Sequence, residues 1–75
     1  MNVLVNPNPS TGIFNIDFEL PTEALLTVLD ASGRVIQSSI ITNDSILDLT
    51  SAVTGIYYLQ INSNDFKKVI RIVKN

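Results

Sequence analysis

The chain has 75 residues, of which 45% are hydrophobic and 16% charged, and its formal net charge at pH 7 is −2. This length allows one small domain and not two. The chain contains no His and no Cys, which excludes thiol nucleophiles and nearly excludes catalytic triads, zinc sites and haem ligation. The acidic balance offers no basic field that could gather a phosphate backbone, so we expect no nucleic-acid partner.

No segment of the sequence predicts membrane insertion. Residues 1–7 lack the basic region and the long apolar run of a secretory signal peptide, and the apolar runs elsewhere are too short to span a bilayer. The absence of Cys fits a reducing cytosol and equally a secreted protein that avoids thiols, so it leaves the compartment open. We expect one soluble domain over residues 1–75, with residues 1–5 as a linker or an added start.

The first half of the chain alternates between turn signals and strand patterns. Residues 6–12 (Asn-Pro-Asn-Pro-Ser-Thr-Gly) predict a rigid, extended loop, because prolines fix φ and glycine permits a turn. Residues 14–20 place an apolar side chain at every second position, which predicts a half-buried strand. Pro21 and Thr22 break that strand. Residues 23–30, which are apolar on both faces, are expected to form a more central one.

The second half continues the same pattern. Residues 30–33 (Asp-Ala-Ser-Gly) have the composition of a hairpin loop, and residues 34–41 form the returning strand. Further short strands are predicted at 46–49, 56–61 and 66–73. Short strands at spacings of about ten residues, without helical periodicity, predict an all-β fold: a small antiparallel immunoglobulin-like β-sandwich of six to seven short strands.

The polar residues favour structural roles over chemistry. The spacing of the carboxylates is that of turns and strand surfaces, and no serine has a histidine to activate it. We therefore expect no catalytic residue, no metal site and no cofactor. Asp30 and Asp48 are expected to fix loops through bonds from side chain to backbone, and Gly12, Gly33 and Gly55 to allow tight turns.

A basic segment with a strand pattern is the most unusual feature, because it holds four of the five basic residues of the chain. Lysines on an edge strand prevent unwanted pairing, so the segment can be merely protective. A partner could instead read the same strand by strand addition or by charge. The pattern alone leaves both interpretations open. The candidate partner-binding residues are Lys67, Lys68, Val69, Ile70, Arg71, Ile72, Val73 and Lys74.

Several short motifs, each weak alone, together resemble the C-terminal sorting domain of the type IX secretion system, type A. Their order and spacing are specific and cover nearly the whole chain. The sequence departs from the family pattern at Leu29, Ala52 and Val53. The motif positions are Asn6, Pro7, Asn8, Pro9 and Gly12, then Asp30 with Gly33, then Asp48, then Gly55 with Tyr57, and finally the basic segment.

This resemblance implies a removable label, not an enzyme, attached to a larger cargo domain in the same chain. An outer-membrane shuttle protein would receive the folded domain, and a sortase-like peptidase would cut at or before Asn6. The cargo would reach the cell surface or the medium through the periplasm and the outer membrane. The open strand edges could also pair two copies into an edge-strand dimer.

Two rival functions stay open. One is a non-catalytic immunoglobulin-like spacer or adhesion module of a multidomain surface protein. The other is a small carbohydrate-binding module, which normally needs exposed aromatic rings. Tyr57 and Tyr58 are neighbours on a strand, so one is expected to point inward and one outward.

Overall fold

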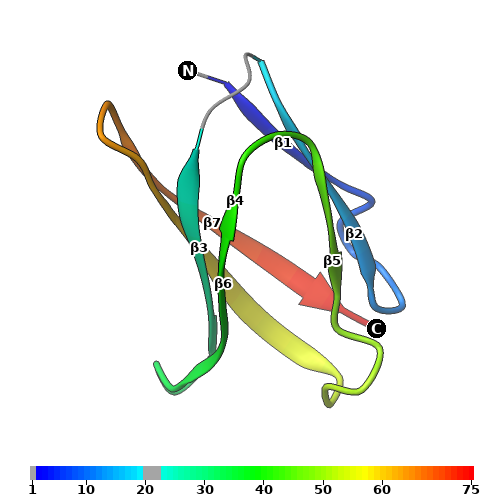
Figure 1. The fold of residues 1–75 in the computed structure, drawn as a ribbon. Helices are drawn as coiled ribbons and strands as arrows, with labels where there is room; N and C mark the ends of the chain where they lie inside the picture. Colours follow the sequence, from blue (N-terminus) through cyan, green and yellow to red (C-terminus); the bar gives the residue numbers. More distant parts are fainter. Residues whose placement is uncertain (1, 20–22) are drawn as a thin grey trace.

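The computed structural model describes residues 2–19 and 23–75, and within these ranges it contains strands and no helix, so no membrane-spanning helix is found there. The strands are β1 (Val3–Asn6), β2 (Ile13–Phe18), β3 (Ala24–Asp30), β4 (Val35–Ile41), β5 (Ser45–Asp48), β6 (Gly55–Asn62) and β7 (Lys67–Lys74). They form two sheets, with the orders β1-β2-β5 and β4-β3-β6-β7, and Figure 1 shows the sheets packed face to face. Every paired strand is antiparallel. The predicted small antiparallel β-sandwich is confirmed.

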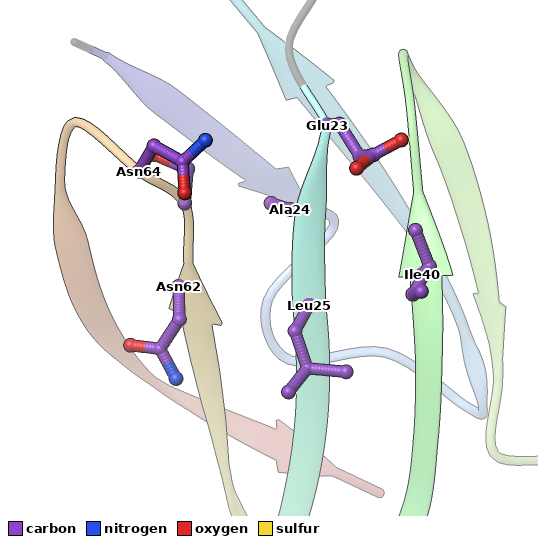
Figure 2. Close-up of a pocket in the computed structure, with 7 residues that line it drawn as sticks. Glu23, Ala24, Leu25, Ile40, Asn62 and Asn64 are labelled. Atoms are coloured by element: carbon purple, nitrogen blue, oxygen red, sulfur yellow. The ribbon is translucent and has the colours of Figure 1, made fainter.

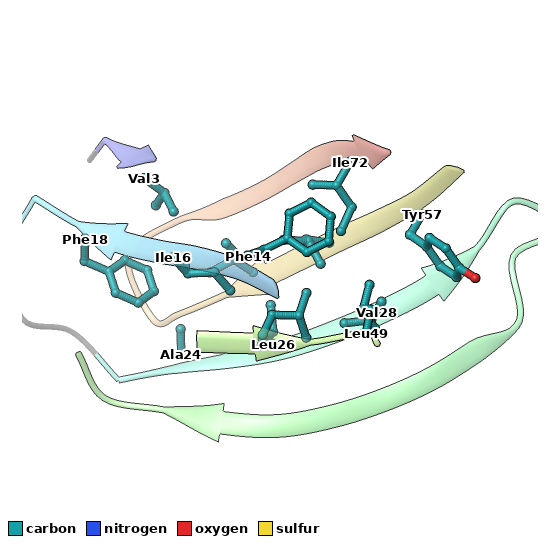
Figure 3. Close-up of a cluster of buried hydrophobic side chains, with 13 residues drawn as sticks. Val3, Phe14, Ile16, Phe18, Ala24, Leu26, Val28, Leu49, Tyr57 and Ile72 are labelled. Carbon is teal, nitrogen blue, oxygen red and sulfur yellow. The ribbon is translucent and has the colours of Figure 1, made fainter. Parts of the chain in front are cut away.

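The core lies between the two sheets and is filled from alternate positions of the strands. Phe14 and Ile16 of β2 are fully buried, as are Leu59 and Ile61 of β6 and Ile72 of β7. Figure 3 shows the side chains of β2 pointing across the sandwich toward those of β3, β6 and β7. Burial of alternate side chains is what fixes the register, because a slip by one residue would turn each apolar set to solvent.

The predicted strands agree with those observed to within one or two residues at their ends. The strand expected at 23–30 is β3, and it is central, because it pairs with both β4 and β6. The end of the strand predicted at 14–20 and the break at 21–22 fall on residues 20–22, outside the described residues.

The structure differs from expectation at the N-terminus. Residues 3–6, expected within or beside a linker, form β1 and pair with β2. Val3 is buried in the core. Val3, Leu4 and Val5 are three apolar residues in a row, without polar alternation, and two prolines follow them closely, so they are too short a signal to predict a strand.

Candidate recognition surface

β7 forms one edge of the four-stranded sheet, and it pairs along its whole length with β6. Its side chains alternate. Lys68, Ile70, Ile72 and Lys74 lie on the more buried face, whereas Lys67, Val69 and Arg71 are exposed. The candidate residues of the basic segment therefore divide between the two faces of one strand. Only those on the outer face and along the edge are open to a partner.

The loop of residues 7–12, which we call the Asn-Pro loop, covers one end of the β7 edge. The Asn8 side chain donates from Nδ2 to the carbonyl oxygen of Arg71 at 3.0 Å and accepts at Oδ1 from the backbone N–H of Val73 at 2.9 Å. A carboxamide carries the same donor and acceptor as a peptide group. Asn8 therefore acts as a substitute for one peptide group of an added strand.

The main chain of Ser10 continues this contact. Its N–H donates to the carbonyl of Val73 at 3.0 Å, and its carbonyl accepts from the N–H of Asn75 at 2.8 Å, in a parallel bridge with Lys74. Ser10 itself is buried. The edge of β7 is thus occupied from the Arg71 carbonyl to the Asn75 N–H.

The remaining part of the edge is open. These contacts show that the peptide groups of odd-numbered residues face away from β6, because outward and inward groups alternate along an antiparallel strand. By that alternation the N–H and carbonyl groups of Lys67 and Val69 also face outward. No residue in the described ranges hydrogen-bonds to them, and Val69 is 62% exposed.

Lys74 has a different environment from the other basic residues. Its side chain is buried, and its ammonium group donates to the carbonyl of Thr50 at 3.1 Å and to that of Ala52. The sequence does not predict contacts to Thr50 or Ala52. The spacing could have indicated that Lys74 points inward, because it follows Ile70 and Ile72 at every second position of the strand. Its charge joins β7 to the turn after β5 and is largely inaccessible to a partner.

Asp48 organises that same turn. Its Oδ1 accepts from the Thr50 hydroxyl at 2.6 Å and from the Thr50 N–H at 2.9 Å. The pKa of Asp48 is held below the usual aspartate range, chiefly by the hydrogen bond from the Thr50 hydroxyl and next by the one from the Thr50 N–H. Desolvation raises the pKa, and the charge of Lys74 makes the smallest contribution to lowering it. The carboxylate is therefore a structural group that shapes the turn receiving Lys74.

Gly12 brings the Asn-Pro loop against the same turn. Its N–H donates to the Ser10 hydroxyl at 3.1 Å, and its carbonyl accepts from the N–H of Leu49 at 2.7 Å. A Cβ on Gly12 would lie 2.9 Å from the Cα of Thr50, and the residue has φ of +145°. Only glycine fits both this backbone angle and this close approach. The peptide bonds that precede Pro7 and Pro9 are both cis.

Asp30 organises the hairpin between β3 and β4. Its Oδ1 accepts from the Ser32 hydroxyl at 2.7 Å and from the backbone N–H groups of Ser32 and Arg34 at 3.0 Å. The side-chain bond from Ser32 is the main reason that the pKa of Asp30 is lowered. Gly33, at φ of +92°, supplies the residue with positive φ in this turn.

Tyr57 and Tyr58 point to opposite sides of β6. Tyr57 is buried, and its hydroxyl donates to the carbonyl of Val53 at 2.5 Å, while Tyr58 is 36% exposed. Phe14 and Phe18 are buried and Phe66 is partly buried against the core. One exposed ring does not make the aromatic platform that a carbohydrate-binding module would need. Gly55 is the first residue of β6, and it pairs with Lys74 of β7.

Comparison with known families gives an assignment for the whole fold. A family model described as a secretion system C-terminal sorting domain matches residues 4–75, which takes in all seven strands except the first residue of β1. No curated protein matches the chain. The family is one of sorting signals and not of enzymes. This chain belongs to the C-terminal sorting domains of the type IX secretion system, which direct a cargo protein across the outer membrane.

Proposed function

We propose that an outer-membrane shuttle protein recognises this domain by strand addition at the open part of the β7 edge, residues 67–71. We further propose that a sortase-like peptidase then removes the domain from its cargo. One observation carries the first part. The outward peptide groups of Lys67 and Val69 have no partner among the described residues, whereas the adjoining groups at residues 71–75 are already bonded to the Asn-Pro loop.

The chemistry of the open edge suits a partner strand. Unpaired N–H and carbonyl groups supply main-chain hydrogen bonds, and side chains beside them supply selectivity. Lys67 and Arg71 are exposed on either side of Val69. Because the two cations flank one apolar residue, the preferred partner strand would present acidic side chains around an apolar one.

The position of β1 supports a cut upstream of Val3. Residues 3–6 pair with β2, and Val3 is buried. A cut inside this strand would remove part of the core from the released domain and leave an unpaired edge on β2. The nucleophile would belong to the peptidase, because this chain has no Cys and no His.

The test is a reporter with a periplasmic export signal, fused ahead of this domain and expressed in a host that has the type IX machinery. Val69→Pro removes an outward N–H without removing a hydrogen bond to β6. We expect it to lower surface delivery about tenfold or more, since strand addition depends on that donor. Ser38→Pro is the matched control. Carrying the same alternation through the registers of β6 and β3 places the Ser38 N–H on the outer side of β4, the opposite edge of the same sheet. This variant removes that N–H and should deliver the reporter normally.

Folding of both variants is checked by thermal unfolding of the isolated domains. Normal delivery by a folded Val69→Pro variant would contradict recognition at this edge. Deletion of residues 70–75, the obvious truncation, is a poor test, because it also removes the buried residues Ile72 and Lys74. Mass spectrometry of the delivered reporter tests removal: a product that still carries the domain would contradict the peptidase step.

A further inference from the structure

β4 is the other edge of the four-stranded sheet, and no described strand pairs with its outer side. Its sequence, Val-Ile-Gln-Ser-Ser-Ile-Ile, contains no charged residue, and none occurs from residue 35 to residue 43. β7 carries four basic residues in its eight positions. The two edges of one sheet therefore differ in charge. Edge strands are normally protected from pairing by charges, prolines or covering loops, and β4 has no charge or proline of its own.

The registers show which peptide groups of β4 are open. The peptide groups of the odd-numbered residues of β7 face away from β6, so those of the even-numbered residues hydrogen-bond to β6. Following the paired positions through β6 and β3 assigns Gln37, Ser39 and Ile41 as the residues whose peptide groups bond to β3. The peptide groups of Ser38 and Ile40 consequently face the open side.

The side chains around this edge are apolar and exposed. Ile40 is 68% exposed, and Leu25, its partner in the register with β3, is 42% exposed. Figure 2 shows both side chains on the outer face of the sheet, in the lining of a shallow pocket that also includes Asn62 and Asn64. The Gln37 side chain donates to the Asp48 carbonyl at 3.1 Å. This bond ties β4 to β5 of the other sheet, so the edge is held in place.

We propose that β4 is a self-association edge, at which a second copy of this chain pairs antiparallel through residues 37–41. The two-fold axis passes beside Ser39, so that Ser39 lies opposite its own counterpart. Ser38 then pairs with Ile40 of the second copy, and Ile40 with Ser38. Each of these pairs exchanges two main-chain hydrogen bonds. The two four-stranded sheets become one continuous sheet, with the exposed Ile40 side chains near each other on its outer face.

Charge favours a second copy at β4 and disfavours one at β7. An antiparallel self-pairing of β7 about Val69 would place Lys67 opposite Arg71 of the other copy, and like charges directly opposite are destabilising. Antiparallel self-pairing of β4 about Ser39 brings no charges together. It places Ser39 opposite Ser39 and Ser38 opposite Ile40. A standard protein interface buries about 1,600 Å² of accessible surface, and one added strand pair buries much less. We therefore expect a weak, concentration-dependent dimer.

Analytical ultracentrifugation of the 75-residue chain from about 10 μM to about 1 mM tests the proposal. The weight-average mass should rise from that of one copy toward that of two. Ser39→Lys and Ser39→Glu each place like charges opposite one another at the two-fold axis. Each is expected to weaken association about tenfold or more, and an equimolar mixture of the two should restore it. Ser39 is exposed, so neither charged side chain has to be buried in the single copy.

Val69→Glu is the control, because it alters the other edge and should leave self-association unchanged. A wild-type chain that stays monomeric throughout would overturn the proposal. Association that survives in both Ser39 variants, or that Val69→Glu abolishes, would place the contact elsewhere and overturn it too. Failure of the mixed variants to associate would refute the register about Ser39. These outcomes are independent of the delivery assay, so the proposal and the secretion function can fail separately.

Discussion

Lys74 shows how a charge near the end of a basic segment can serve the fold. Its ammonium group bonds two main-chain carbonyls, those of Thr50 and Ala52, at a point where solvent is largely excluded. Carbonyls at a turn need donors once they are buried. Lys74 supplies them from the last position of β7, so it holds the strand against the turn that follows β5.

Replacing Lys74 with Met should destabilise the domain by about 1–3 kcal/mol, because the carbonyls of Thr50 and Ala52 lose a charged donor. Lys67→Met, at an exposed position of the same strand, should change stability by no more than about 0.5 kcal/mol. Urea denaturation of the two variants measures the difference. Equal stabilities would show that the buried ammonium contributes nothing.

Asp48 should make part of the stability depend on pH. Its folded-state pKa is lowered, chiefly by the Thr50 hydroxyl hydrogen bond, so the folded domain binds fewer protons than the unfolded chain near the usual aspartate pKa of about 3.9. The resulting stabilisation is present above that value and is lost as the pH falls through the folded pKa. Asp48→Asn removes this dependence.

The measurement is the difference in unfolding free energy between wild type and Asp48→Asn at neutral and at acidic pH. We expect wild type to be the more stable at neutral pH and the difference to shrink on acidification. Asp17→Asn, at a strand position without these hydrogen bonds to Thr50, is the control. A difference that grew on acidification would contradict the assigned role.

Among the elements, the Asn-Pro loop acts as a short additional strand on β7. Two of its residues, Asn8 and Ser10, make four hydrogen bonds to the outward groups of residues 71–75. Half of these bonds come from a side chain, so the loop extends the sheet without adopting regular strand pairing. The loop thereby shortens the edge that a partner can use.

Asn8→Ala should open the covered part of the edge. The N–H of Val73 loses its acceptor at Asn8 Oδ1, so its hydrogen exchange should become about tenfold faster or more. The N–H of Ile72, which faces β6, should keep its protection. Asn64→Ala, in the exposed turn before β7, is the matched control. Unchanged exchange at Val73 would show that Asn8 does not close the edge in solution.

Strands could be predicted from the sequence better than the contacts between them. The alternation in residues 14–20 and the turn chemistry of residues 30–33 are local signals, and both gave the correct element. β1 offers only three apolar residues in a row, which is too weak a signal to predict a strand. The contact of Asn8 with Val73 spans 65 positions, and no local pattern encodes which strand a loop will cover.

At the scale of the whole molecule, the sheet β4-β3-β6-β7 has two unlike edges. One is basic and partly covered by the Asn-Pro loop, and the other carries no charge and mixes apolar with small polar residues. The family match could be anticipated from the order of the motifs, because they span nearly the full chain. The division of the basic segment into open, covered and buried residues could not be predicted from the sequence, because it arises only when the two ends of the chain meet.

The parallel alignment of residues 8–10 with residues 71–75 also has a mechanical consequence. Because the two segments are parallel, opposite pulls on the chain ahead of residue 8 and on residue 75 would load all four hydrogen bonds together in shear, instead of parting them one after another. A domain of this size has only modest thermodynamic stability, yet in this geometry its two ends would resist being pulled apart along the strand direction.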